Sequence, residues 1–229
     1  MTKDEFESTL QKPLEYWKNK NKKEVEELLG ADAAAMVGYD QRNPHHCHDL
    51  FMHTLHTVNG LDRHSPVLLK TAAFFHDIGK PSVAVEKNGR LVFYRHAKMS
   101  AKIAESLLHQ IGYDTDDIKT ICFFIRHHDD FISWVLPEEE YDHNNPYLVE
   151  ISSRNLSKHI ESVKNKAELP DKHYTLELWR ELLWLCRADA SAQAKLVYMN
   201  GEPVDSKEHK TKKIDRLLSI ICEFYTGEL

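Results

Sequence analysis

Apolar residues recur along most of the chain at intervals of three or four, which is the spacing of one face of an α-helix. The clearest stripe runs through Leu178, Leu182 and Leu185. Turn and cap residues bound several stripes: Gly112 ends one, and Asp114 begins the next as a helix N-cap. We therefore predict an all-α fold. The predicted helices cover about residues 13–30, 47–60, 65–78, 99–111, 114–128, 146–167, 174–195 and 206–225.

One segment departs from the helical spacing. In residues 83–94, β-branched and aromatic residues lie on both sides of the pair Asn88-Gly89. An Asn-Gly pair between two such runs is typical of a β-hairpin with a two-residue turn. We predict a small two-stranded flap over residues 83–94 within the helical fold.

Composition supports a compact globular protein. The 229 residues are 41% hydrophobic and 29% charged, with only 8 Gly and 8 Pro, which excludes disordered and collagen-like chains. A chain of this length buries roughly 70% of its unfolded surface on folding. We predict a single domain over residues 1–229, with an exposed acidic loop at 137–146.

The net charge of −6 argues against non-specific binding to a nucleic-acid backbone, although a nucleotide or a short oligonucleotide remains a possible substrate. The lysine-rich stretches at 18–23 and 207–213 are more simply solvated helix faces. No run of about 18 apolar residues occurs, and the N-terminus is too polar for a signal peptide, so we expect a cytoplasmic protein without a membrane span. The cysteines are far apart, which indicates reduced thiols rather than a zinc knuckle. They are Cys47, Cys122, Cys186 and Cys222.

Histidine is the unusual component, with 15 residues, eleven of them between His45 and His128. His76 follows Leu69 and Ala72 at spacings of seven and four, so it shares their core-facing stripe. Asp77 comes next, at the end of this apolar helix. A single inward histidine is more often a hydrogen-bonded core residue than a ligand. Three others lie on similar inward stripes: His53, His127 and His128.

Asp189 occupies a core position on the stripe that begins at Leu178. A buried carboxylate needs a cationic partner, which is either an arginine such as Arg187 or a metal ion. Together with inward-facing histidines on other helices, a metal is the simpler partner. Imidazole nitrogens and carboxylate oxygens bind Mn, Fe, Co, Ni or Zn. The set that favours a metal is His53, His76, Asp77 and Asp189.

The order of these residues resembles the HD-domain metal-dependent phosphohydrolases. The pattern is His53, then His76-Asp77 within FFHDIGKP, then Asp189 within WLCRADASA. The resemblance implies an all-α fold in which the four ligands converge from separate helices on one divalent metal.

Two further segments narrow the resemblance. The run FYRHAKMSA at 93–101 is similar to the segment after HDIGKP in the HD portion of bacterial tRNA nucleotidyltransferases, and residues 43–55 resemble that group's approach to the first ligand. The similarity covers about residues 40–195. No Gly-Gly-x-x-x-Arg-Asp motif of nucleotidyl transfer is present. We therefore expect a stand-alone HD domain with helical extensions at both ends.

Three histidines also resemble the ligands of a second metal in dinuclear HD phosphodiesterases. By this resemblance Asp77 bridges two ions, and His96 and His127 bind the second. His128 either binds it as well or donates a hydrogen bond to a ligand. The expected cofactor is one or two divalent ions, among Mn, Fe, Co, Ni, Mg and Zn.

The resemblance implies hydrolysis of a phosphate ester by metal-activated water. Asp77, His96 and His127 are the expected catalytic residues, and Lys80 and Arg126 are expected to hold the phosphate. The substrates of similar families are nucleotides, 2′,3′-cyclic phosphates and cyclic dinucleotides, and the sequence selects neither one of these nor an oligomeric state. Two alternatives are a non-catalytic, metal-stabilised regulatory module and a tRNA-processing accessory protein.

Overall fold

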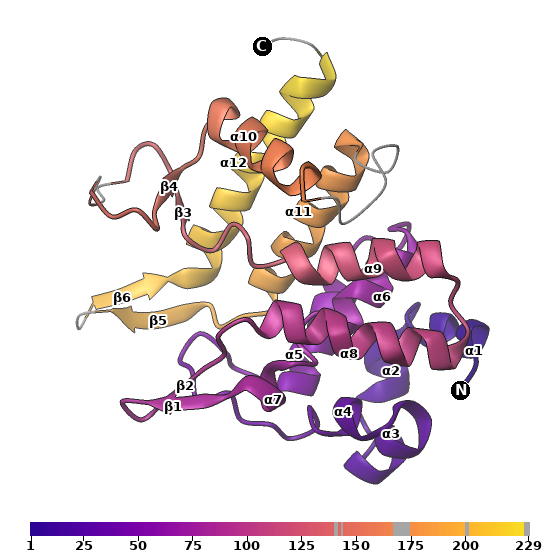
Figure 1. The fold of residues 1–229 in the computed structure, drawn as a ribbon. Coiled ribbons are helices and arrows are strands. Elements are labelled where there is room, and N and C mark those ends of the chain that lie inside the picture. The colour runs from indigo at the N-terminus through magenta and orange to yellow at the C-terminus, as the bar shows by residue number, and fades with distance from the viewer. Residues whose placement is uncertain (140–141, 143, 167–174, 200–201, 227–229) are drawn as a thin grey trace.

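The computed structural model describes residues 1–139, 142, 144–166, 175–199 and 202–226. Helices dominate the fold, and the strands form only two-stranded pairs (Figure 1). The predicted all-α architecture with a small hairpin is therefore confirmed. No helix in the described part of the chain is both long and apolar enough to cross a membrane.

The N-terminal region is a series of short helices rather than the single helix predicted over 13–30. The predicted helix is interrupted at Asn21, whose side chain accepts a hydrogen bond from Glu24 N. The backbone N–H of Asn21 in turn donates to the Glu24 carboxylate. This capping box starts a new helix. Thr2 forms a similar box with Glu5 and starts a helix that the sequence reading missed. The helices are α1 (Lys3–Thr9), α2 (Pro13–Trp17), α3 (Lys22–Leu29) and α4 (Ala31–Ala34).

Four of the five central helices match the predictions to within a few residues, and the short helix Lys80–Val83 was not predicted. Asp49 and Asp114 cap two of them by accepting hydrogen bonds from backbone N–H groups of the first turn. Gly112 ends α8 with a φ of 98°, a left-handed conformation that glycine adopts readily. The helices α8 and α9 lie side by side (Figure 1). The central helices are α5 (Leu50–Gly60), α6 (Val67–Phe75), α7 (Lys80–Val83), α8 (His96–Ile111) and α9 (Thr115–His127).

The predicted flap is confirmed. Strands β1 (Val85–Lys87) and β2 (Arg90–Val92) pair antiparallel. The turn residues Asn88 and Gly89 both have positive φ, 53° and 74°, as a type I′ turn requires. The hairpin projects from the helical body beside the start of α8 (Figure 1).

The C-terminal region contains strands that the helical predictions overlooked. The predicted helix at 146–167 begins only at Ser153, after a short parallel pair of strands, and the helix predicted to reach 195 ends at Ser191. A second hairpin follows. The predictions for residues 140–141, 143, 167–174 and 200–201 lie outside the described residues. The elements are β3 (Trp134–Val135), β4 (Val149–Glu150), α10 (Ser153–Lys164), α11 (Leu176–Ser191), β5 (Leu196–Met199), β6 (Glu202–Asp205) and α12 (Ser206–Thr226).

Candidate metal centre

Four polar side chains from three parts of the chain meet in the protein core. His53 lies on α5, His76 and Asp77 follow α6 directly, and Asp189 lies near the end of α11. His53, His76 and Asp77 are each at most 1% exposed. Since α5, α6 and α11 contact one another, their stripes bring these residues together although up to 136 positions separate them (189 − 53).

The polar atoms of these residues lie close together. The distance from His53 Nε2 to Asp189 Oδ1 is 2.9 Å, and from His76 Nε2 to Asp77 Oδ2 it is 3.2 Å. His76 Nε2 is 3.6 Å from Asp189 Oδ1, and His53 Nε2 is 3.7 Å from Asp77 Oδ2. The alternative partner for Asp189 is excluded, because Arg187 pairs with Asp215 at 2.6 Å. The arrangement therefore groups two imidazoles with two carboxylates.

The hydrogen bonds of the imidazoles leave their Nε2 atoms available as ligands. In each of four histidines, Nδ1 lies within hydrogen-bond distance of a backbone carbonyl, so we place the proton on Nδ1. A metal-binding histidine typically donates its other ring N–H in this way, which fixes the tautomer and the ring orientation. The distances are 3.5 Å for His53 to Ala192, 2.8 Å for His76 to Ala73, 3.0 Å for His96 to Phe93 and 2.7 Å for His128 to Ile125.

Three buried atoms at the centre have no hydrogen-bond partner among the described residues: His53 Nε2, His76 Nε2 and Asp77 Oδ1. Buried polar atoms are almost always satisfied, so three such atoms on adjoining residues need an explanation. His53, His76 and Asp77 also offer ligand atoms that all lie within 4.8 Å of one another. The chemistry and the geometry of this set fit a divalent cation.

The carboxylates of Asp77 and Asp189 favour positive charge at the centre. Burial alone would raise the pKa of Asp77, but His76 and Lys80 hold it well below its usual range. Burial would lower the pKa of His76, but the carboxylates of Asp77 and Asp189 raise it to about 10. His46, whose ring centroid is 5.0 Å from that of His53, behaves in the opposite way, because burial and nearby Lys80 lower its pKa to about 2. The two ionised carboxylates thus attract positive charge, which a second proton on His76 supplies and a metal ion at Nε2 would replace, whereas His46 remains neutral.

A second group of donors shares Asp77 with the first. Asp77 Oδ1 is 3.1 Å from His96 Nε2 and 3.6 Å from His128 Nε2, whereas Oδ2 faces His53 and His76. Asp77, His96 and His128 also offer ligand atoms within 4.8 Å of one another. We call His53, His76, Asp189 and Asp77 Oδ2 cluster one. We call His96, His128 and Asp77 Oδ1 cluster two.

Asp129 belongs beside cluster two and was missed in the sequence reading. Its Oδ2 is 3.1 Å from His96 Nε2, and its Oδ1 is 3.6 Å from His128 Nε2. Its side chain is 34% exposed, more than those of the other residues in the clusters, so it lies between the buried donors and solvent. Its position directly after the His127-His128 pair was the available signal.

The structure places His128 in cluster two, whereas His127, the other histidine expected at the second metal, pairs with a different carboxylate. His127 Nδ1 is 2.7 Å from Asp130 Oδ2, and His159 Nε2 is 3.0 Å from the same oxygen. Burial raises the pKa of Asp130, but hydrogen bonds from the two histidines lower it to about 2. Successive residues at the end of α9 point in different directions, so only one of the two adjacent histidines faces Asp77.

Of the two expected phosphate-holding residues, Lys80 lies at the centre and Arg126 does not. Lys80 Nζ is buried, 2.7 Å from Asp77 Oδ2, and donates to Gln41 Oε1 at 3.0 Å. Arg126 lines a separate cavity of about 520 Å³ beside α8. Lys80 thus pairs with the Asp77 carboxylate, whereas Arg126, the other residue expected to hold the phosphate, lines a cavity that contains no residue of the two clusters.

Gly79 sets the distance between the His76-Asp77 turn and α8. Its N–H donates to Ser100 Oγ at 2.9 Å, and a Cβ added at Gly79 would lie 2.5 Å from Ser100 N. Because His96 is the first residue of α8, this close approach brings His96 to Asp77.

A cavity of about 270 Å³ opens onto the centre. Asp189, His128 and Asp129 line one part of it, and Lys210 and Lys213 of α12 line another. Burial lowers the pKa of both lysines. The sequence reading treated this lysine run as a solvated helix face, but the structure turns two of its members towards the clusters.

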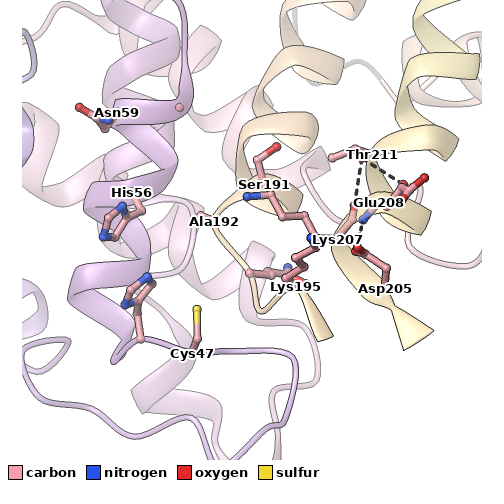
Figure 2. Close-up of a pocket in the computed structure, with 13 residues that line it drawn as sticks. Cys47, His56, Asn59, Ser191, Ala192, Lys195, Asp205, Lys207, Glu208 and Thr211 are labelled. Atoms are coloured by element: carbon pink, nitrogen blue, oxygen red, sulfur yellow. Dashed lines mark hydrogen bonds between the residues drawn. The ribbon is translucent and has the colours of Figure 1, made fainter. Parts of the chain in front are cut away.

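A larger cavity of about 850 Å³ lies between α5 and the start of α12 (Figure 2). His56 of α5 and Cys47 line one side of it, and Lys195 and Lys207 line the other. Gln193 lines both this cavity and the one at the clusters. No residue of cluster one or cluster two lines the larger cavity. The candidate metal centre is therefore reached from the smaller cavity, of about 270 Å³.

Comparison with known proteins agrees with this geometry. The sequence pattern of the HD domain matches residues 50–217, which include every residue of the two clusters. The chain is also 32% identical over 120 residues to the CC-adding tRNA nucleotidyltransferase of Thermus thermophilus. That similarity covers 49% of this chain and 26% of the relative, so the chain spans about a quarter of the relative's length. With the matched segment covering most of its length and the four signature residues gathered in its core, this chain belongs to the HD domain family.

Proposed function

We propose that this protein hydrolyses a phosphate ester of a nucleotide, or a phosphodiester, with the help of one or two divalent metal ions. The observation that carries the proposal is the position of Asp77. One buried carboxylate directs each of its oxygens at a different pair of histidines. A group arranged in this way suits two cations held side by side.

A divalent ion bound there would lower the pKa of a water ligand towards neutrality and polarise a phosphoryl oxygen. The protein's own groups complete the site. Asp189 and Asp77 hold negative charge in the core, and the Nδ1–H bonds keep the histidine rings in place. Lys210 and Lys213 face the cavity, where they can bind the non-bridging oxygens of a phosphate. Asp129, which lies nearest to solvent, is placed to accept a proton.

The donors indicate which ions are suitable. Clusters one and two contain four imidazoles and two carboxylates, with Asp129 adjacent. Such a set suits Mn, Fe, Co, Ni or Zn better than Mg, which prefers oxygen ligands and retains water. We therefore propose two ions of the first group, with Asp77 shared between them.

An open cavity distinguishes this proposal from a purely structural metal site. Structural metal sites are closed by protein ligands, whereas catalytic sites keep a position open to substrate. Here the cavity reaches Asp129 and Asp189. The name of the Thermus relative, a tRNA nucleotidyltransferase, supports a nucleotide or an RNA end as the substrate class.

The experiment is a comparison of metal content with turnover. The protein is stripped of metal and reloaded with Mn, Co, Ni, Zn, Fe or Mg, and hydrolysis is followed with bis(p-nitrophenyl) phosphate, p-nitrophenyl phosphate and a 2′,3′-cyclic nucleotide. Asp77→Asn should remove bound metal and lower turnover by more than about a hundredfold, the upper end of the cost of losing an outer partner of a ligand. Asp215→Asn changes an exposed aspartate outside the centre and serves as the matched control. Full turnover by Asp77→Asn, or no hydrolysis of any of the three substrates by metal-loaded native protein, would contradict the proposal.

A further inference from the structure

The cavity lined by Arg126 is strongly basic, although the chain as a whole carries a net charge of −6. Its other charged members are Arg95, Lys98, Lys102 and Glu105. Four cations against one carboxylate give this small region an excess of positive charge. The lysine-rich stretches that the sequence drew attention to lie elsewhere, so the region is a separate feature of the fold.

Three of these cations have no ionic partner. Among the described residues, the side chains of Arg95, Lys98 and Lys102 form no hydrogen bond and no ion pair within 4.0 Å. Some surface cations, such as Lys119 and Lys212, are neutralised by a carboxylate, whereas these three unpaired cations line one cavity together. A group of like charges without partners repels itself, and an anionic ligand would relieve this repulsion.

The backbone arranges the three cations in a row. Lys98 and Lys102 are four residues apart on one face of α8, and Arg95, the left-handed residue that precedes the helix, lines the same cavity. At a rise of about 1.5 Å per residue the row is roughly 10 Å long. A row of this length can contact consecutive phosphates of one strand.

The remaining wall of the cavity suits the other parts of a nucleotide. Tyr94 is 63% exposed, and Val83 and Met99 add apolar surface. An exposed aromatic ring beside a row of cations is the combination with which proteins bind single-stranded nucleic acid, because bases stack on the ring while the cations follow the backbone.

We propose that Arg95, Lys98, Lys102 and Tyr94 form a binding site for a single-stranded oligonucleotide. The proposal does not depend on Arg126. The site begins one residue from His96 of cluster two, so a strand bound there is held beside the metal centre. Binding is independent of hydrolysis, and its failure would leave the proposed activity standing.

The experiment measures binding of a fluorescently labelled 10-nucleotide RNA, and of the DNA of the same sequence, between 50 and 200 mM salt. Three phosphate contacts on a single strand predict a slope of about −2 in log K against log salt, or roughly a twentyfold loss of affinity over this range. The variant Arg95→Ala/Lys98→Ala/Lys102→Ala should abolish most of this slope. Lys98→Ala/Lys102→Ala, which spares the neighbour of His96, should leave a slope of about −0.7. Tyr94→Ala should weaken binding about fivefold or more.

The matched control is Lys18→Ala/Lys22→Ala/Lys23→Ala, which removes the same charge from exposed positions in the N-terminal region. It should bind like the native protein. The proposal is overturned if the control loses as much affinity as the triple variant at residues 95–102, or if the native protein does not bind the strand. It is also overturned if equal concentrations of a nucleoside triphosphate or of polyglutamate compete as well as the unlabelled strand, since the site would then bind any anion.

Discussion

Replacing Gly79 by alanine tests whether the contact between the His76-Asp77 turn and α8 builds cluster two. Gly79 has a φ of −81°, which alanine adopts without strain, so only the space around the new Cβ matters. That Cβ would lie 2.5 Å from Ser100 N and 2.9 Å from the Met99 carbonyl carbon. Both are backbone atoms of a 16-residue helix, and they cannot rotate out of the way.

The cost follows from these distances. Ordinary contact begins at 3.4 Å, so the turn and α8 must separate by about 0.9 Å (3.4 − 2.5). Overpacking of this kind costs about 1–3 kcal/mol, and weakening the hydrogen bond from Gly79 N to Ser100 Oγ adds about 1 kcal/mol. His96 moves with α8, so its 3.1 Å approach to Asp77 lengthens. We expect a stability loss of about 2–4 kcal/mol and loss of metal from cluster two before cluster one.

The assay combines urea unfolding of metal-loaded protein with the number of metal ions bound per chain. Gly60→Ala is the matched control, because a Cβ at Gly60 would lie 3.7 Å from Ala188 Cβ, an ordinary contact. It should be neutral or should stabilise the protein by up to about 1 kcal/mol. A Gly79→Ala protein with the native urea midpoint and the native metal content would refute this account of how α8 is positioned.

Three further predictions follow from the contacts at the centre. Asp129→Asn should lower metal occupancy of cluster two and spare cluster one, so that metal analysis falls towards one ion per chain. Lys210→Met should reduce kcat/KM for a phosphodiester by roughly 10–100-fold, the effect of one charged hydrogen bond, at unchanged metal content. Asp130 has a folded pKa of about 2, below its value of about 3.9 in the unfolded chain, so its ionised form stabilises the fold at neutral pH by about 2–3 kcal/mol. This contribution is present above about pH 4 and is lost as the pH falls through 2, so urea unfolding in chelator should show native protein and Asp130→Asn converging over that range.

The helices were predictable where a stripe of apolar residues ended at a strong cap, as at Asp114 and Gly112. The errors arose where local signals were overlooked or were absent. The break at Asn21 was marked by Asn21 and Glu24, a recognisable capping pair. The sequence has an Asn-Gly pair at 200–201, which is a hairpin signal, but no strand was predicted beside it, and the helix at 174–195 was extended past its end at Ser191. The pairing of β3 with β4 joins two-residue strands across a long connection, and no local pattern reveals such a contact.

The residues of the candidate site were predictable from their order in the sequence, but the directions of their side chains were less predictable. The sequence indicated His53, His76 and Asp189 because each lies on an apolar stripe, and Asp77 because it follows His76 at the end of an apolar helix; the structure brings all four together. It could not decide between two adjacent histidines at the end of α9, because a change of about 100° in direction depends on how the helix is rotated in its packing. The contribution of Lys210 and Lys213 of α12 was harder still to predict, because these lysines reach the cavity only when α12 packs against the rest of the fold.

The wide separation of the metal-binding residues along the chain has a thermodynamic consequence. His53 and Asp189 meet only when α5 and α11 are packed, so the unfolded chain does not contain the complete site. Any ion that binds there therefore stabilises the folded state by mass action, by about 2.7 kcal/mol when the free ion is at a hundred times its Kd. The melting temperature of this protein should accordingly report the concentration of available metal, and a chelator should act on it as a denaturant.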